Sequence, residues 1–133
     1  MATRTIYLRT YGEYDRVKAD EPTDLPLLKG TLDLLILKTL SWGPMHGYGI
    51  ATWLEQQSAG ELAVDDSALY QALQRLETRG LVEGEWGVTD NNRRARYYRV
   101  TTTGRQRFRA QAETWTRYTK SVSAILAVAS RRG

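Results

Sequence analysis

The sequence has no cysteine and a single histidine, His46, and each of these shortages excludes certain bonds and sites. Without cysteine the chain forms neither disulfides nor thiolate metal sites, and one imidazole has no second histidine for a metal site or a catalytic pair. No apolar run is long enough to cross a bilayer, and the N-terminus lacks the layout of a secretory signal. We therefore expect a cytoplasmic protein with no metal, no cofactor and no membrane-spanning segment.

Paired carboxylates and phosphate-binding loops are also scarce. The adjacent acids Asp65 and Asp66 are explained by the start of a helix. The glycine-rich stretch HGYG (46–49) has no lysine after it and no predicted strand before it. Gly47 and Gly49 are better explained by the close approach of two helices than by a phosphate cradle. We therefore expect a binding protein and not an enzyme.

Basic residues are concentrated in the C-terminal third of the chain. Residues 1–88 hold 8 Lys and Arg against 13 Asp and Glu, whereas residues 89–133 hold 11 against 2. Seven of those 11 are arginines between Arg93 and Arg109, where there is no acid. In a chain of 133 residues, long enough for one compact domain, such a block suits a polyanion, either nucleic acid or an acidic membrane surface. A solvated basic face would have the same composition.

Hydrophobic periodicity predicts three helices in the first two thirds of the chain. They run from Pro26 to about Leu40, over about 46–58, and from Asp65 to just before Gly80. In the third helix, Asp65 is a suitable N-cap, and the i, i+3, i+4, i+7 spacing predicts a buried face. That face consists of Leu69, Ala72, Leu73 and Leu76. Residues 1–24 have no clean period and are expected to form an arm of uncertain order.

After the third helix the apolar period changes to two, which predicts a β-hairpin. LVEGEWGV (81–88) and RRARYYRV (93–100) alternate as strands, and TDNN (89–92) supplies turn residues. The register that we expect pairs Val82 with Val100, Glu83 with Arg99, and Trp86 with Arg96. It gives Arg99 a cross-strand ion pair and sets Arg96 beside an indole ring. Arg93 and Arg94 remain at the tip with no assigned partner.

The face of the third helix opposite its buried side carries uncharged polar side chains, where Lys and Glu would be usual. Three helices followed by a hairpin with a basic tip form a winged helix-turn-helix, so we expect a mainly α domain with a small β-hairpin over 25–102. Gln suits adenine edges, Tyr and Ser reach bases or phosphates, and guanidinium suits the DNA backbone and minor groove. The expected DNA contacts are Tyr48, Ser67, Tyr70, Gln71, Gln74, Arg93 and Arg94. The alternative is that the helix residues are simply exposed polar side chains.

The last part of the chain, 103–130, is expected to form one long dimerisation helix. Apolar residues recur there at a spacing of three or four, interrupted by Gln111, and the pattern consists of Phe108, Trp115, Tyr118, Val122 and Ile125. At about 1.5 Å per residue the helix is roughly 40 Å long, too long for the domain to cover. We therefore expect these five residues to form the interface of a homodimer. The alternative is that Trp115 packs only on the first helix of its own chain.

Four blocks of the sequence resemble the PadR family of bacterial transcriptional regulators, in its short form with a single C-terminal helix. They are TLDLLILKTLSWGPMHGYGIA (31–51), SALYQALQRLETRGLV (67–82), EWGVTDNNRRARYYRVTTTGR (85–105) and ETWTRYTKSVSAIL (113–126). The blocks lie in the family's order and spacing and span roughly 27–126. The resemblance implies a homodimeric repressor that binds an inverted repeat in promoter DNA and releases it on meeting a small molecule.

The resemblance also implies roles for single residues. Tyr70 matches the family's recognition helix, and Arg93 and Arg94 match its basic wing. Trp115 matches an aromatic residue at which some members hold planar aromatic compounds between paired C-terminal helices. Two positions depart from the pattern, since Ala68 stands where Ser or Thr is frequent and Gln71 where Pro is frequent.

Three classes of function remain open at this point. A sequence-specific regulator would have double-stranded DNA, a second copy of the chain and a planar aromatic small molecule as partners, and no membrane. The alternative is a basic winged-helix module that binds nucleic acid or another polyanion without sequence specificity or small-molecule control. The third class is a basic surface protein that docks on an acidic membrane or on a partner, with no sequence preference and no need of Ser67, Tyr70 or Gln74.

Overall fold

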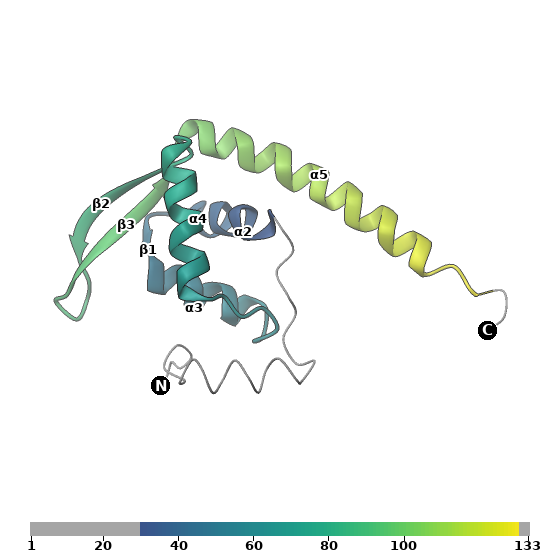
Figure 1. Ribbon diagram of the computed structural model, residues 1–133, viewed down its shortest axis with the longest axis horizontal. Helices are drawn as coiled ribbons and strands as arrows, with labels where there is room; N and C mark the ends of the chain where they lie inside the picture. The colour runs from purple at the N-terminus through teal and green to yellow at the C-terminus, as the bar shows by residue number, and fades with distance from the viewer. Residues whose placement is uncertain (1–29, 131–133) are drawn as a thin grey trace.

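The computed structural model describes residues 30–130, in which four helices surround the base of a three-stranded sheet (Figure 1). The helices are α2 (Thr31–Leu40), α3 (Gly47–Gln57), α4 (Asp66–Thr78) and α5 (Thr102–Leu126). The strands are β1 (Met45–His46), β2 (Val82–Val88) and β3 (Arg94–Val100). The predicted mainly α fold, a winged helix-turn-helix followed by a long helix, is confirmed. The expected arm, 1–24, lies outside the described residues, as do residues 26–29 of the first predicted helix. The prediction that this helix runs on through Gly30 was wrong, because Gly30 has a left-handed φ of 85°, which glycine adopts readily, and precedes α2 as its N-cap.

Helices α2, α3 and α4 pack on one another around an apolar core, with α4 between the hairpin and α2 (Figure 1). The most deeply buried side chains are Ile36, Leu37 and Leu40 of α2, Ile50 of α3, and Leu69, Leu73 and Leu76 of α4. Each contributes about 1.5–3 kcal/mol by its removal from water. The buried face predicted for the third helix is confirmed, and its burial fixes which face of α4 is exposed.

Both ends of α4 are set by local hydrogen bonds. At the start, Asp65 Oδ2 accepts a 3.0 Å hydrogen bond from the backbone N–H of Ala68, which satisfies one of the free N–H groups of the first turn. At the end, Gly80 has a φ of 73°, and Leu81 N–H donates to the carbonyl of Leu76 at 2.9 Å. This left-handed residue with a six-to-one hydrogen bond ends the helix and directs the chain into β2.

The sheet has the strand order β1-β3-β2 and is antiparallel throughout. The predicted hairpin register is confirmed. It pairs Val82 with Val100, Glu83 with Arg99, and Trp86 with Arg96. The expectation that no strand precedes HGYG was wrong, because Met45 and His46 form β1 and pair with Tyr98 and Tyr97, which adds a third strand to the predicted hairpin. Two residues are too few to show a period of two, so the sequence pattern contains no signal for β1.

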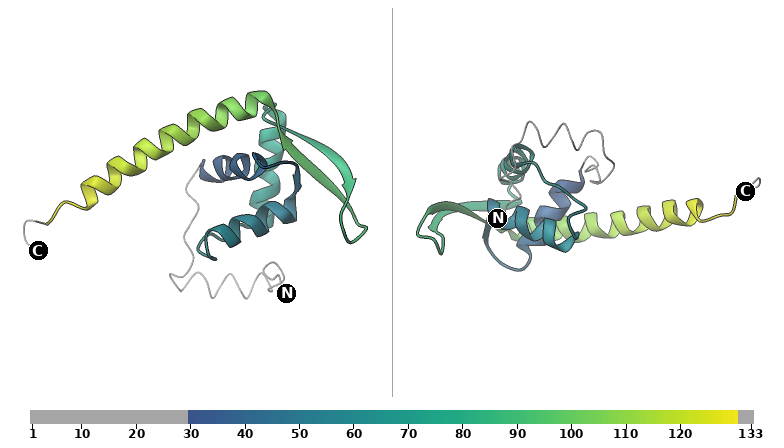
Figure 2. Two further views of the ribbon diagram at one scale, coloured as in Figure 1. Left: turned by 180° about the vertical axis from the view of Figure 1, so that it is seen from behind. Right: turned by 90° about the horizontal axis from the view of Figure 1, so that it is seen from below.

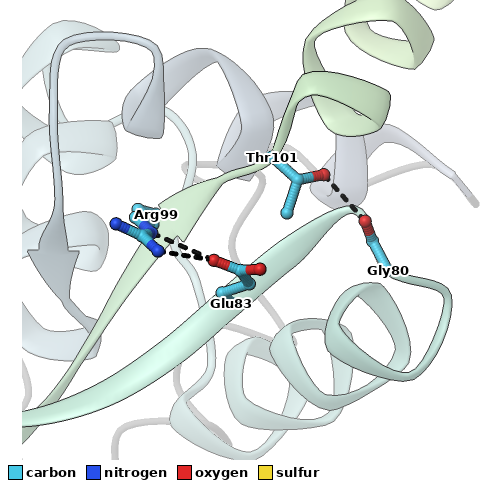
Figure 3. Close-up of polar contacts among 4 residues, drawn as sticks. All are labelled: Gly80, Glu83, Arg99 and Thr101. Carbon is cyan, nitrogen blue, oxygen red and sulfur yellow. Dashed lines mark hydrogen bonds and ion pairs between the residues drawn. The ribbon is translucent and has the colours of Figure 1, made fainter.

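Helix α5 begins at the base of the hairpin and is fixed there by Thr101. The Thr101 hydroxyl donates to the carbonyl of Gly80 at 2.7 Å (Figure 3). The same hydroxyl accepts a 3.0 Å hydrogen bond from Gly104 N–H. From this corner α5 passes α2, with which it is in contact, and its second half extends away from the other elements (Figures 1 and 2). The long helix is therefore anchored at one end and projects at the other.

Candidate nucleic-acid interface

The exposed face of α4 carries the four polar residues that the sequence pattern placed there. Ser67, Tyr70, Gln71 and Gln74 are all exposed, whereas the face behind them is buried in the core. The neighbouring Arg75 is also exposed, but its guanidinium bonds Asp33 of α2 at 2.8 Å. The exposed face therefore offers hydroxyl, amide and phenol groups on a helix that is held firmly from behind.

Tyr70 is both a surface residue and a packing residue. Its side chain is 51% exposed, yet a Cβ placed on Gly47 would lie only 2.6 Å from the Tyr70 hydroxyl oxygen. Partial burial raises the pKa of Tyr70 above its usual value, so the hydroxyl keeps its proton and remains a donor at neutral pH. The predicted close approach at Gly47 is confirmed. At Gly49 it was wrong, because the nearest atoms there belong to the side chains of Met45 and His46, which precede it in the chain.

His46 has a structural role at the start of α3. Its Nδ1 accepts a 2.9 Å hydrogen bond from Gly49 N–H, which makes it the N-cap of the helix. The imidazole ring also lies 5.2 Å from the ring of Tyr97, centroid to centroid. Tyr48, two residues further along the chain, is 50% exposed. Among residues 30–130, no group of three or more histidines and acids is close enough to hold a metal ion.

The tip of the hairpin is a tight turn between Thr89 and Arg93. Thr89 N–H donates to the carbonyl of Arg93 at 2.8 Å, and the Thr89 hydroxyl accepts from Arg93 N–H at 3.2 Å. Asn92 has a φ of 61°, a left-handed conformation that asparagine tolerates. Asn91, Asn92 and Arg93 are exposed. The turn thus presents the Arg93 side chain at the end of the wing, as predicted.

Two arginines of β3 are held by acids. Arg99 bonds Glu83 Oε1 through Nε at 3.1 Å and through Nη2 at 2.7 Å, which confirms the predicted ion pair (Figure 3). Arg96 lies beside Trp86 as predicted, but its guanidinium also bonds Glu77 of α4 at 2.6 Å. These hydrogen bonds to carboxylates raise the pKa of both arginines. The contact with Glu77 has no sequence signal, because it joins a helix end to a strand 19 residues later.

The prediction that Arg94 has no partner was wrong. Its Cζ lies 4.4 Å from the ring centroid of Trp86, closer than the Cζ of Arg96 at 5.9 Å. Because Arg94 is paired with Val88, it is the diagonal neighbour of Trp86 on the same face of the sheet. A long side chain spans that diagonal, so the predicted register already contained this contact. Arg93, in contrast, uses its backbone N–H and carbonyl for the hydrogen bonds with Thr89 that the structure describes.

A groove of about 760 Å³ separates the wing from α4 and the start of α3. It is lined by His46, Tyr48, Tyr70 and Trp86 on the one hand and by Arg93, Arg94 and Arg96 on the other. Four of the predicted DNA contacts therefore meet at one surface. The other three, Ser67, Gln71 and Gln74, lie on α4 outside the lining of the groove. Cationic and hydrogen-bonding groups that converge in this way suit the phosphate backbone of a nucleic acid.

The predicted interface of α5 divides into a covered and an exposed part. Phe108 packs against the apolar core of its own chain, and Trp115 is partly covered. The rings of Trp115 and Tyr118 are 6.2 Å apart, centroid to centroid. Tyr118, Val122 and Ile125 are 61%, 37% and 71% exposed, and Leu126 beyond them is 78% exposed. The projecting half of α5 thus carries large apolar side chains that residues 30–130 leave exposed. None of the helices in 30–130 has the length and apolar character needed to cross a membrane.

Comparison with known proteins identifies the family. The family model described as "Transcriptional regulator PadR-like family" matches residues 36–110. A PadR family transcriptional regulator from Eggerthella lenta is similar in structure, with 27% sequence identity, a TM-score of 0.67, and coverage of 89% of this chain and 99% of that one. A transcriptional regulator from Clostridium thermocellum has 27% identity and a TM-score of 0.66 over 72% of this chain and 90% of that one.

A sequence relative matches about two thirds of the chain. An uncharacterised protein of Lysinibacillus sphaericus is 25% identical over 89 residues, which are 67% of this chain and 82% of the relative. The residues that match the family run from the middle of α2 through α4 and the wing into α5, and they include most of the surface described above. The chain therefore belongs to the PadR-like family of transcriptional regulators and is not an enzyme.

Proposed function

We propose that the protein is a sequence-specific DNA-binding regulator that places α4 in the major groove and the wing against the adjacent backbone. The observation that carries this proposal is the pairing of two surfaces of different chemistry. The exposed face of α4 has uncharged hydrogen-bonding groups, and the wing beside it has a cluster of arginines. Base edges are read by the first kind of group and phosphates are neutralised by the second.

The residues of α4 have separate tasks in this proposal. Gln71 and Gln74 are exposed amides that can pair with adenine through two hydrogen bonds, and each such pair discriminates against a wrong base by about 1–3 kcal/mol. Ser67 and Tyr70 donate hydroxyl protons to bases or phosphates. Tyr48, at the start of α3, faces the same groove as Tyr70 and donates to the backbone.

We also propose that the regulator acts as a homodimer on an inverted repeat. Exposed Tyr118, Val122 and Ile125 on a projecting helix support this, because a soluble monomer rarely leaves large apolar side chains clustered in water. A two-fold dimer buries the same surface of both copies and presents two α4 helices related by symmetry. Two such helices match the two half-sites of an inverted repeat.

Repression and its release by a planar aromatic compound form the last part of the proposal. A dimer bound across a promoter blocks transcription, and the partly covered Trp115 next to Tyr118 offers a flat aromatic surface at the start of the projecting half of α5. A compound that stacks there between the two copies would change how the copies are held together. This function resembles that implied by the family, and Trp115 is the residue that carries it here.

Binding to the DNA upstream of the protein's own gene, compared with scrambled DNA of the same composition, tests the proposal. We expect tighter binding to the upstream DNA and a steep loss of affinity with salt. About six neutralised phosphates give a slope near −5 in a plot of log affinity against log salt concentration. Equal affinity for both DNAs at moderate salt would support the alternative, a module that binds polyanions without specificity.

Two variants separate base reading from phosphate binding. Replacing Arg94 with alanine is expected to weaken binding to all sequences alike and to reduce the salt slope by about one. Replacing Gln74 with alanine is expected to narrow the gap between upstream and scrambled DNA while it leaves the slope unchanged. If both variants narrow that gap equally, the division of roles between α4 and the wing is wrong.

The ligand site is tested by tryptophan fluorescence. Planar aromatic compounds are titrated against the protein and against a Trp115→Ala variant, which retains Trp42, Trp53 and Trp86. We expect quenching that saturates in the parent protein and is lost in the variant. Identical curves for the two proteins would exclude a binding site at Trp115.

A further inference from the structure

Four side chains form a continuous chain of contacts from the end of α4 to the tip of the wing. Glu77, in the last turn of α4, bonds Arg96 at 2.6 Å. The Cζ of Arg96 is 5.9 Å from the ring centroid of Trp86, and the Cζ of Arg94 is 4.4 Å from the same centroid. The indole of Trp86 is thus shared by two guanidinium groups, and within residues 30–130 only that of Arg96 is bound to an acid.

The sheet register places these side chains on one face. Trp86 is paired with Arg96 and Val88 with Arg94, so all of them point to the side of the hairpin that faces α4. Next to them Gly84 leaves room for Arg96, since a Cβ there would lie 2.5 Å from Arg96 Nε. The guanidinium of Arg96 therefore lies across the hairpin at Gly84 and reaches Glu77. This contact fixes the distance between the wing and α4.

The stack of Arg94 on Trp86 is exposed to solvent, unlike a buried ion pair. Trp86 is 55% exposed, and Arg94 is exposed and lines the groove beside α4. A free arginine side chain samples many rotamers and loses that freedom when it binds a phosphate. A guanidinium that is already stacked on an indole has lost part of its rotamer freedom before binding, so the arginine loses less conformational entropy when it binds a phosphate.

We propose that Trp86 is a positioning residue for DNA binding, which holds the guanidinium of Arg94 toward the phosphodiester backbone while the Arg96–Glu77 ion pair fixes the wing to α4. The inference rests on the proposed function, because it assigns to Trp86 a part in the contact between the wing and DNA. Trp86 itself does not touch DNA in this arrangement. Arg93, at the tip and without such a stack, contacts DNA as a mobile charge.

Affinity measurements on upstream DNA test the proposal. Trp86→Leu removes the aromatic face but keeps an apolar side chain at an exposed position, and it is expected to weaken binding about fivefold, which corresponds to about 1 kcal/mol. Trp86→Phe keeps a ring and is expected to restore most of the affinity. Val88→Ala is the matched control, because Val88 lies on the same strand and face, is 63% exposed and lies outside the lining of the groove.

Two further readouts separate positioning from a merely structural role. In the Arg94→Ala background, Trp86→Leu is expected to cause no further loss of affinity, since the side chain that it positions is gone. Trp86→Leu is also expected to leave the salt slope unchanged, because the charge of Arg94 remains, whereas Arg94→Ala reduces the slope by about one. An equal loss from Trp86→Leu in both backgrounds would mean that Trp86 contacts DNA itself and would overturn the proposal.

A measurement on the protein without DNA tests the positioning role of Trp86 independently of the proposed DNA-binding function. The order parameter of the Arg94 Nε–Hε group, from NMR relaxation, is expected to be higher than that of Arg93 and to fall in Trp86→Leu. Equal order parameters for the two arginines in the parent protein would overturn the positioning role whether or not the protein binds DNA. Failure of the parent protein to prefer upstream DNA, with an ordered Arg94, would instead contradict the proposed function alone.

Discussion

Replacing Gly104 with alanine is expected to destabilise the protein, although alanine is the better helix former. Inside a helix, alanine contributes about 1 kcal/mol more than glycine. At this position, however, an added Cβ would overlap the carbonyl oxygen of Leu81 and lie 2.7 Å from Cγ2 of Val100. The oxygen of Leu81 belongs to the backbone and accepts a 3.0 Å hydrogen bond from Thr101 N–H. It cannot rotate away as a side chain would, so the first turn of α5 has to move.

The size of the effect follows from what that movement breaks. It separates Thr101 from the corner between α4 and β2. There the Thr101 hydroxyl bonds the carbonyl of Gly80 at 2.7 Å (Figure 3), and the Thr101 N–H bonds the carbonyl of Leu81 at 3.0 Å. Each bond contributes about 0.5–1.5 kcal/mol. Opening the packing beside Val100 costs about 1 kcal/mol more. After the gain in helix propensity is subtracted, the expected loss is about 1–3 kcal/mol in the free energy of unfolding.

Urea unfolding followed by circular dichroism measures this loss. Protein concentration is held constant across variants, because association changes the apparent stability. Ala110→Gly is the control, since Ala110 is exposed in the same helix and its replacement costs helix propensity alone, about 1 kcal/mol. A Gly104→Ala variant as stable as the parent, or more stable, would refute the close contact between α5 and the corner at Leu81.

Three further perturbations test other parts of the structure. Asp65→Ala removes the N-cap of α4 and is expected to lower the free energy of unfolding in urea by about 1 kcal/mol, and Asp65→Asn is expected to lower it less. An Asp65→Ala variant as stable as the parent would contradict the capping role of Asp65. Burial raises the pKa of Tyr70, so the stability gained from its protonated phenol is present below about pH 10 and is lost as pH rises through the folded-state pKa. The free energy of unfolding of Tyr70→Phe is therefore expected to fall less than that of the parent between about pH 9 and about pH 11, on either side of the ordinary pKa of tyrosine. Parallel curves of this free energy against pH for the two proteins would argue against partial burial of the Tyr70 phenol. Ile125→Glu places a charge on the exposed apolar surface of α5 and is expected to shift the protein from dimer to monomer in sedimentation at micromolar concentration. The control Lys120→Glu, at an exposed position of the same helix, is expected to remain dimeric. If both variants remain dimeric, the interface does not include Ile125.

Local patterns were enough to predict much of the fold. The start and buried face of α4 followed from Asp65 and the spacing of its leucines, because a cap and a helical period are local properties. The hairpin register followed from matching Val82 with Val100, since the period of two fixes every other pair once one pair is known. The same register also implied that Trp86 and Arg94 are diagonal neighbours.

Contacts between distant segments were not predictable in this way. Strand β1 exists because Met45 and His46 find an open edge of β3, and nothing in two residues indicates that edge. The Arg96–Glu77 ion pair depends on the angle between α4 and the hairpin, which packing determines. The packing of Tyr70 on Gly47 depends in the same way on how α3 approaches α4. These three contacts shape the groove beside α4. The sequence therefore predicted several residues of the candidate site, but its geometry could be obtained only from the structure.

A DNase footprint on the DNA upstream of the gene tests the central proposal most directly. The account predicts a protected segment that contains two half-sites with inverted symmetry, one helical turn or a small multiple of it apart, at about 10 base pairs per turn. It also predicts that Gln74→Ala loses this protection at a protein concentration at which the parent retains it. Uniform protection along the whole fragment, unchanged in Gln74→Ala, would contradict sequence-specific binding by α4.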